Sequence, residues 1–571
     1  MDREVNYKNK RRYKTAKYPI RQPIYLTWLI QFLSKIMLMG KDYKLEKINM
    51  EGVKPPYILL SNHMSFIDFE LVSGLTYPQK VNNVVNIDGY YMRPWLMEWI
   101  GAICTRKFTN DIHLVRSIRK VLKRGDILCM YPEARYSPCG VSSYIPDSVG
   151  YLIKSNKVPV VTVLHRGNYL HSPFWNVKRK RKVPLHTTMT LTLTAEEAAT
   201  LTPEEINARI REALTYNDYE YQLSEGFRIT EPWRAEGLHK ILYRCPHCQT
   251  ESGMTSKGAE LTCEACGKVW HMNEDSTLTA TEGETEFTHI PDWFAWERQC
   301  VREEVLSGTY SFEDTVDIHS MPRCYRFMPL GEGKLTHDPE NGFVLTGHYR
   351  GEDFRIQRKP LQTNSLHVEY DFPHVKPFDC VDISTENDSF YCYPTKENVV
   401  TKLAFATEEI YKLHEPETKR LRPERGDLQA PRARDQTPSP RAGRTKGNDV
   451  KRNRRSKRRY NRKLIIALAY FDRFLLPLLM VFVPIGLVPL HESGKLFALT
   501  FGGATVLFAL YLLMGYLFRW THYFCSIQSA YHIPLTPENV DWGFVKKSDA
   551  YGIPAIFGVL GIAMIVLGFV F

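Results

Sequence analysis

The chain has 571 residues, of which 43% are hydrophobic and 24% charged, and its formal net charge is +12. This length allows two to four domains, and the composition excludes a wholly disordered chain. The positive charge is concentrated, because residues 419–463 contain 18 Lys or Arg against 4 Asp or Glu. The remainder is close to neutral, so a strongly basic folded domain is excluded as well.

Residues 1–40 combine a basic N-terminus with one apolar stretch. Residues 1–21 lack the apolar core of a secretory signal. Residues 24–39 carry apolar side chains almost all round a predicted helix, which is too short to cross a bilayer. Tyr25, Trp28 and the upstream basic residues favour a helix lying in the membrane interface, and a buried core helix is the alternative.

Between residues 41 and 216, short β-rich runs alternate with helical stretches. Strands are predicted at residues 57–60, 81–87, 127–131, 158–164 and 187–193, and helices at 112–124, 147–156 and 203–216. Strands alternating with helices are typical of an α/β domain with a layered, mostly buried sheet.

The main catalytic candidate is His63, which precedes Asp68 by five positions in residues 61–68, Ser-Asn-His-Met-Ser-Phe-Ile-Asp. Ser65 and Asp68 form a variant of the capping box, with Ser at the N-cap and an acid at N3. Such an acid folds back toward the incoming chain, so Asp68 can orient the imidazole of His63 and fix its tautomer. His63 can then accept a proton from an alcohol. The alternative is that His63 packs near a turn and Asp68 only caps the helix.

Three further blocks follow this dyad in a fixed order. They are residues 101–107 (Gly-Ala-Ile-Cys-Thr-Arg-Lys), 131–137 (Tyr-Pro-Glu-Ala-Arg-Tyr-Ser) and 158–160 (Val-Pro-Val). With Asn62 to Asp68 they resemble the glycerolipid acyltransferase family of the lysophosphatidate (1-acylglycerol-3-phosphate) acyltransferase type. The family motifs are Asn-His-x-Ser-x-x-Asp, Gly-x-x-x-x-x-Arg, Phe-Pro-Glu-Gly-Thr-Arg-Ser and an apolar block with Val-Pro-Val. The resemblance extends over residues 43–216, under a third of the chain.

This resemblance implies an O-acyltransferase with His63 as general base. The donor is acyl-CoA or acyl carrier protein, and the acceptor is a lysophospholipid, with lysophosphatidate giving phosphatidate as the favoured reaction. The acceptor is expected to contact a set of polar residues: Thr105, Arg106, Lys107, Glu133 and Arg135.

Two departures from the family motifs concern the cations. Arg106 stands one place before the family position, which Lys107 occupies, and Ala134 to Tyr136 replace Gly-Thr-Arg. A phosphate group needs cations, but which of these side chains contacts it is left open by the sequence. Without the neighbouring motifs, Arg106 and Lys107 would be interpreted as a solvated surface pair.

Four cysteines form a metal-binding pattern after a connector at residues 217–242. Cys245 and Cys248 are followed, after 14 residues, by Cys263 and Cys266. Paired Cys-x-x-Cys knuckles supply four thiolates for tetrahedral zinc, so residues 243–271 are predicted to form a zinc ribbon with structural Zn²⁺. The ligand set is complete without His247. The other cysteines lack framework spacing, and no structural disulfides are expected.

Residues 272–415 are predicted to form a β-rich domain closed by a helix. Short alternating strands are expected at residues 343–347, 354–356, 366–370, 380–383 and 389–393, followed by a helix at 397–414. A pleckstrin-like barrel is one candidate for this domain.

Residues 416–462 are basic and rich in Pro, Gly, Ser and Thr, which predicts a disordered polybasic linker. Residues 463–571 follow with three apolar stretches at 464–490, 496–518 and 553–571, each long enough to span a bilayer as a helix. The basic linker is then expected on the cytoplasmic side, where it favours contact with anionic lipid over nucleic acid. These features predict an integral membrane protein of the bacterial cytoplasmic membrane with a cytosolic catalytic domain.

Two further functions remain open from the sequence. The chain could be a membrane-anchored adaptor with a degenerate acyltransferase domain, whose zinc ribbon and β-rich domain recruit a partner or lipid. It could also bind nucleic acid through the ribbon and the basic linker, although each of these features has a commoner explanation.

Overall fold

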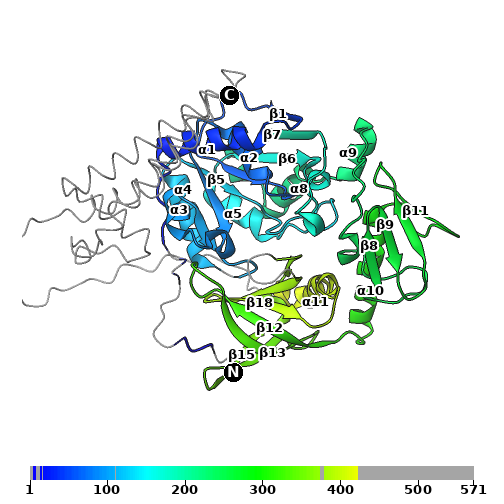
Figure 1. Cartoon of the computed structure of the whole chain (residues 1–571). Helices are drawn as coiled ribbons and strands as arrows, with labels where there is room; N and C mark the ends of the chain where they lie inside the picture. Colours follow the sequence, from blue (N-terminus) through cyan, green and yellow to red (C-terminus); the bar gives the residue numbers. More distant parts are fainter. Residues whose placement is uncertain are drawn as a thin grey trace, which may run out of the picture. The chain divides into compact units, whose positions relative to one another are not determined.

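The computed structural model describes residues 4–7, 13, 15, 17–109, 111–372 and 378–421 (Figure 1). The chain forms two compact units, Met1–Ala430 and Pro431–Phe571, and every described residue belongs to the first unit. The three apolar stretches expected to span the membrane lie outside the described residues. Within the described residues, no helix is both long and apolar enough to cross a bilayer.

A seven-stranded mixed sheet forms the first layer, in the order β1-β7-β6-β2-β5-β3-β4. Only β6 and β7 pair in antiparallel fashion; the other neighbours are parallel. The strands are β1 (Tyr43–Ile48), β2 (Ile58–Ser61), β3 (Val81–Asn86), β4 (Ile103–Thr105), β5 (Ile127–Met130), β6 (Val160–Arg166) and β7 (Leu185–Leu193). The predicted α/β domain with a layered sheet is confirmed at this level.

Helices cover both faces of this sheet (Figure 1). The helices of this part of the chain are α1 (Ile24–Leu38), α2 (Asp68–Thr76), α3 (Pro94–Trp99), α4 (Ile112–Lys123), α5 (Ser148–Asn156), α6 (Asn168–His171), α7 (Ala195–Thr200), α8 (Pro203–Ala213) and α9 (Asp218–Glu225), of which α2 covers one face and α4, α5 and α8 the other. Successive strand residues point to opposite faces. Ile58 of β2 therefore packs in the cluster that contains α4, α5 and α8, whereas Leu59 packs in the cluster that contains α2.

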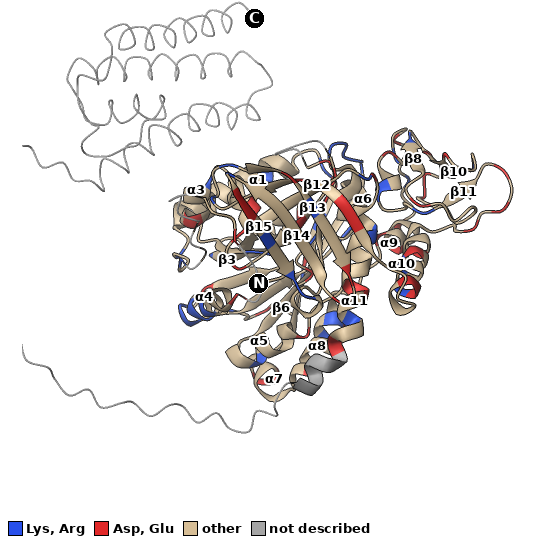
Figure 2. Ribbon diagram, turned by 90° about the horizontal axis from the view of Figure 1, so that it is seen from below, with Lys and Arg blue, Asp and Glu red and all other residues tan. Residues whose placement is uncertain are grey.

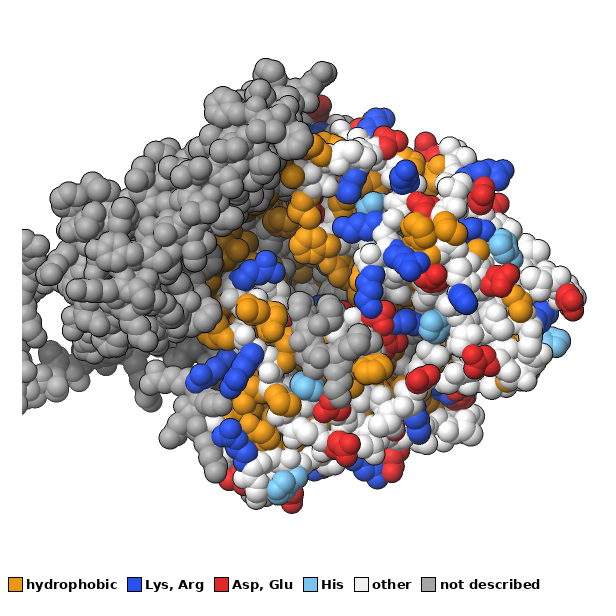
Figure 3. All heavy atoms as spheres, in the orientation of Figure 1, with side chains coloured by type: hydrophobic (Ala, Val, Ile, Leu, Met, Phe, Trp, Pro, Cys, Tyr) orange, Lys and Arg blue, Asp and Glu red, His pale blue; other side chains and the backbone are white. Residues whose placement is uncertain are grey.

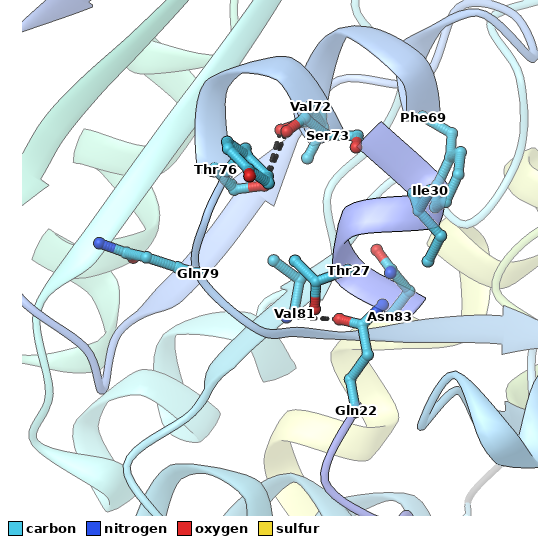
Figure 4. Close-up of a pocket in the computed structure, with 11 residues that line it drawn as sticks. Gln22, Thr27, Ile30, Phe69, Val72, Ser73, Thr76, Gln79, Val81 and Asn83 are labelled. Carbon is cyan, nitrogen blue, oxygen red and sulfur yellow. Dashed lines mark hydrogen bonds between the residues drawn. The ribbon is translucent and has the colours of Figure 1, made fainter. Parts of the chain in front are cut away.

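Helix α1 packs on α2 through one side only. Leu26, Thr27, Ser34 and Leu38 are buried, whereas Trp28 is 67% exposed. Figure 4 shows a small pocket between the helices, where Thr27 and Ile30 of α1 face α2 and the backbone amide of Val81 donates to the side chain of Gln22. The helix is therefore neither fully buried nor isolated, and its outer side presents apolar groups.

The four-cysteine segment carries a small antiparallel sheet in the order β11-β10-β9-β8. Its strands are β8 (Met254–Lys257), β9 (Glu260–Cys263), β10 (Val269–Met272) and β11 (Leu278–Ala280). It is followed by a helix that the sequence analysis did not predict, α10 (Ile290–Leu306), with Pro291 in its first turn. Trp270 of β10 meets Trp293 of α10 with ring centroids 4.9 Å apart, which joins this sheet to the helix.

A second seven-stranded sheet is wholly antiparallel, in the order β15-β14-β13-β12-β18-β17-β16. Its strands are β12 (Phe312–Ser320), β13 (Met328–Asp338), β14 (Gly342–Tyr349), β15 (Glu352–Arg358), β16 (His367–Glu369), β17 (Cys380–Ser384) and β18 (Ser389–Pro394). The predicted β-rich domain is confirmed, and its assignment to a pleckstrin-like barrel stays a prediction. Helix α11 (Val400–Leu421) closes it and continues into residues 416–421, where a disordered linker was expected.

One apolar core runs through all three parts. Its buried members include Met64 and Tyr169 near the first sheet, Trp270 in the four-cysteine segment, and Ile318 and Phe405 in the β-rich domain. The N-terminal residues join the same core, because Tyr7 is buried and its hydroxyl hydrogen-bonds to Ser320 at 2.9 Å. The β-rich domain is therefore fixed against the part of the chain that carries His63.

Candidate active site

His63 lies in the loop that joins β2 to α2, at the end of the central strand, and Asp68 is the first residue of α2. The Nδ1 atom of His63 is 3.1 Å from Oδ2 of Asp68. The same oxygen accepts hydrogen bonds from the backbone amides of Met64, at 2.7 Å, and Ser65, at 3.1 Å. Asn168 of α6 donates to the other carboxylate oxygen at 2.7 Å. Asp68 is fully buried and held from both sides, so the orientation of the imidazole is fixed.

The start of α2 differs from the capping box expected from the sequence. The helix begins at Asp68, and the Ser65 hydroxyl has no hydrogen-bond partner among the described atoms. The amide of Asp68 instead donates to the carbonyl oxygen of Ser65 at 3.2 Å. The carboxylate of Asp68 still folds back and accepts the hydrogen bonds of the loop amides without help from Ser65. It is this carboxylate that contacts His63.

Two tyrosine rings flank the imidazole of His63. The ring centroids of Tyr131 and Tyr136 lie 4.0 and 4.1 Å from that of His63. Burial lowers the pKa of His63 below its usual value, although Asp68 acts in the opposite direction. Its side chain remains 21% exposed. His63 is therefore a neutral base near pH 7, with Nδ1 facing Asp68 and Nε2 available to a hydroxyl group.

The carboxylate of Asp68 stays ionised despite its burial. Desolvation raises its pKa, but the imidazoles of His165 and His63 and the amide of Asn168 lower it below its usual value. Because Asp68 remains an anion, it also stabilises His63 in the protonated state that follows proton transfer.

Residues 131–137 form the loop that passes over His63. The backbone amide of Ser137 donates to the carbonyl oxygen of His63 at 2.8 Å. Ala134 adopts a φ of 56°, in the left-handed region that favours glycine. Glu133 is buried and accepts hydrogen bonds from the amide of Ser143 and the hydroxyl of Tyr216, both at 3.3 Å. Burial raises the pKa of Glu133 to about 7. Glu133 therefore supports this loop from behind.

All three predicted phosphate-binding cations reach the β-rich domain. The Nζ atom of Lys107 is 2.9 Å from Nε2 of His367. The guanidinium of Arg106 donates to the carbonyl oxygen of Glu386 at 3.2 Å, and its Nε and Nη2 atoms are buried without a described partner.

Arg135 forms a buried ion pair with Glu408 of α11, with Nη2 and Oε1 2.6 Å apart. Thr105 lies at the end of β4, and its hydroxyl is 3.4 Å from the carbonyl oxygen of Arg106. Among the predicted phosphate-binding cations, Lys107 is the one whose positive charge lowers the pKa of His63. The structure thus brings Lys107 toward the dyad and directs Arg106 and Arg135 toward the neighbouring domain.

The sequence analysis did not identify the polar groups that the β-rich domain contributes here. Asp88, His367 and Glu369 lie together beside Lys107. His367 and Glu369 occupy alternate positions of a short strand, and this spacing was the only local signal that they share a face. Their proximity to Lys107 depends on contacts between residues hundreds of positions apart.

The four cysteines of the ribbon segment lie together. All four sulfur atoms are within 4.8 Å of one another. Sγ of Cys245 is 3.8 Å from that of Cys266, and Sγ of Cys248 is 3.7 Å from that of Cys263. Four thiolates about 2.3 Å from a tetrahedral metal ion are separated by roughly 3.8 Å, so these distances fit such an ion.

Comparison with known proteins gives a partial likeness. No family model matches the chain, and no curated protein matches it. A solved structure that it resembles is that of the 1-acyl-sn-glycerophosphate (LPA) acyltransferase PlsC from Thermotoga maritima. The identity is 17% and the TM-score 0.28, over 33% of this chain and 77% of that one.

Proposed function

We propose that the protein is an O-acyltransferase that moves a fatty acyl group from a thioester donor to a hydroxyl group of a lysophospholipid. The observation that carries this proposal is the His63–Asp68 pair, in which a buried, ionised carboxylate holds Nδ1 of a neutral imidazole. A base with this orientation suits proton abstraction from an alcohol.

Nε2 of His63 removes the proton of the acceptor hydroxyl as its oxygen attacks the carbonyl carbon of the thioester. A tetrahedral intermediate forms and collapses with cleavage of the carbon–sulfur bond. The thiolate of coenzyme A or acyl carrier protein then takes the proton back from the imidazolium. The fixed Asp68 stabilises the imidazolium throughout, so the site requires no acyl-enzyme.

Lys107 is the cation best placed for a phosphate on the acceptor, because its charge acts on His63. Arg135 is held by the carboxylate of Glu408, and Arg106 donates to the backbone carbonyl oxygen of Glu386 while its Nε and Nη2 atoms have no described partner. Lysophosphatidate, which becomes phosphatidate, is the proposed acceptor, with the ammonium group of Lys107 as the main cation that recognises its phosphate.

The test is transfer of labelled acyl groups to a panel of lysolipids by the full-length protein, with both donor types. His63→Ala should abolish transfer, and His348→Ala is the matched control because His348 is exposed on β14. Retained transfer by His63→Ala would refute the assignment. Absence of transfer by the unsubstituted protein over the whole panel would favour the adaptor function instead.

We also propose that the cysteine cluster binds structural Zn²⁺. Cys245 and Cys263 belong to the continuous apolar core, so loss of metal should destabilise the fold around them. Metal analysis of the full-length protein should find zinc in proportion to intact clusters, and Cys263→Ser should remove it. Equal zinc in the variant would contradict the proposal.

We further propose that the protein is an integral protein of a bacterial cytoplasmic membrane, with the described part on the cytosolic side. Apolar side chains are exposed on the outer side of α1 and beside it: Ile24, Tyr25, Trp28, Met37 and Met39. Helix α4 carries exposed basic residues and no acidic ones (Figure 2). Lys120 of α4 lies 4.1 Å from the ring of Tyr18, next to the segment that leads into α1.

Exposed apolar and basic side chains lie next to each other on one face of the described part (Figure 3). This pairing suits the interface of an anionic bilayer. Replacing Trp28 with Ser should weaken the binding of a peptide of residues 1–40 to vesicles that contain anionic lipid. Binding is measured by flotation of the peptide with the vesicles, detected without tryptophan fluorescence because the substitution removes Trp28. Unchanged flotation would argue against α1 as the contact.

A further inference from the structure

A second group of potential metal ligands lies where the β-rich domain meets the catalytic part. Asp88 belongs to the short helical turn Ile87–Tyr90 that follows β3, whereas His367 and Glu369 belong to β16. Their ligand atoms all lie within 4.8 Å of one another. Nε2 of His367 is 2.7 Å from Oε1 of Glu369, and His367 is only 1% exposed.

The neighbouring strand offers a candidate for a fourth ligand. Asp382 of β17 pairs directly with His367 of β16 in the antiparallel sheet, so both side chains project from the same face. Asp382 is 4% exposed, and Ser384 donates a hydrogen bond to its Oδ1 atom at 3.0 Å. Its Oδ2 atom is buried and has no hydrogen-bond partner among the described atoms.

A buried carboxylate oxygen without a partner is costly, and it needs either a proton or a cation. Because Asp382 pairs with His367 across the sheet, its side chain lies on the face that carries His367 and Glu369.

We propose that Asp88, His367, Glu369 and Asp382 bind a divalent cation of the Mn²⁺ class between the two sheets. One imidazole nitrogen and several carboxylate oxygens form a donor set that suits Mn²⁺, and the set contains no thiolate. It therefore differs in chemistry from the cysteine cluster. The cation would join the β-rich domain to the catalytic part, because Asp88 belongs to one and the remaining ligands to the other.

Lys107 is the competitor of this cation. Its ammonium group lies 3.1 and 2.9 Å from the two ring nitrogens of His367. An imidazole nitrogen that ligates a metal ion cannot also accept a hydrogen bond from this ammonium, so metal binding displaces Lys107 from His367. Removal of the positive charge at residue 107 should consequently strengthen metal binding.

Mn²⁺ binding to the full-length protein in detergent is measured by the loss of the electron paramagnetic resonance signal of free Mn²⁺. One site is expected in the unsubstituted protein. His367→Gln and Asp382→Asn should each weaken its binding by at least the roughly 10- to 100-fold that follows loss of a group which only orients a ligand, while Lys107→Gln should tighten it. His348→Gln, at an exposed histidine, should leave it unchanged.

Zinc content and the urea midpoint of each variant identify those that remain folded, and Asp382→Asn keeps the shape of the side chain if His367→Gln does not fold. Absence of Mn²⁺ binding by the unsubstituted protein, or equal binding by both ligand variants, would overturn the proposal. The measurement involves no acyl transfer, so its outcome is independent of the proposed enzymatic activity.

Discussion

Glu408 offers a quantitative test of how the β-rich domain is attached. Its carboxylate is 5% exposed and pairs with Arg135 of the catalytic loop at 2.6 Å and with Arg298 of α10. Ser365 donates a further hydrogen bond at 2.7 Å. Glu408→Gln removes the negative charge and leaves the buried guanidinium of Arg135 without its counter-ion, whereas Arg298 keeps Glu409 at 3.6 Å.

The loss of unfolding free energy caused by this substitution follows from the pKa of Glu408 and, separately, from buried ion pairs in other proteins. Burial opposes ionisation of Glu408, but Arg135 and Arg298 lower its pKa from 4.5 to about 2. At about 1.4 kcal/mol for each pH unit, this difference corresponds to roughly 3 kcal/mol of stability at neutral pH. Removing one partner of a buried ion pair costs about 3–5 kcal/mol in other proteins.

The assay is urea unfolding of the full-length protein in detergent, monitored by tryptophan fluorescence. The control is Glu313→Gln, because Glu313 and Lys334 form a pair in which both side chains are more than half exposed, and such pairs contribute less than about 1 kcal/mol.

The pH dependence has a definite sign. Because the folded pKa of Glu408 is depressed, its contribution is complete above pH 4.5 and is lost as the pH falls toward 2. The difference between Glu408→Gln and the unsubstituted protein should therefore be constant from pH 7 to 5 and shrink below that range. A difference under about 1 kcal/mol at pH 7 would refute the attachment described here.

Three other substitutions test the site and its support. Asp68→Asn should lower acyl transfer at pH 7.5 by about 10²- to 10⁴-fold. The acid limb of the pH–rate profile lies below 6.5 because burial lowers the pKa of His63, and it should move to lower pH when the negative charge of Asp68 is lost. An unchanged pH–rate profile would contradict the pairing of His63 with Asp68. Ala134→Gly should raise the free energy of unfolding by about 1 kcal/mol or less, since relief of the left-handed φ of 56° outweighs the greater freedom of glycine in the unfolded chain; destabilisation in urea would oppose this. Gly150→Ala should cost about 1–3 kcal/mol, because its Cβ would lie 2.3 Å from a backbone oxygen of α8, whereas Gly253→Ala, with 3.6 Å to the nearest atom, should be tolerated by the same measure.

The parts of the site that sequence could predict are those set by short-range geometry. His63 and Asp68 are five residues apart, and one turn of chain before a helix decides whether they meet. The Cys-x-x-Cys knuckles are equally local. The fold class also followed from local patterns, because alternation of strands with helices is visible in a single sequence.

The contacts of the cations could not be predicted in the same way. Arg135 meets Glu408, and Lys107 meets His367, only after the β-rich domain has packed on the catalytic part. Nothing in the spacing of a basic residue indicates which distant carboxylate it will contact. The contacts of these cations are therefore determined by the tertiary structure alone.

Among the elements that were not predicted, two had recognisable signals in the sequence. Helix α10 has Pro291 in its first turn and buried Trp293, Glu297 and Val301 at helical spacing. Strand β12 alternates buried and more exposed residues over Phe312–Ser320, but several of its residues are charged. Helix α10 was missed because residues 272–415 were interpreted as β-rich up to a closing helix. Strand β12 was missed because its acidic residues interrupt the apolar pattern of a strand.

The apolar core that runs from Tyr7 through Met64 and Trp270 to Phe405 bears on how this protein can change during evolution. Folds built from separately packed domains exchange those domains by recombination, because each carries its own core. Here a recombination point between the first sheet and the cysteine segment would leave apolar faces uncovered on both products. The three parts are therefore expected to be inherited as one block, with sequence change in one part compensated in the other two.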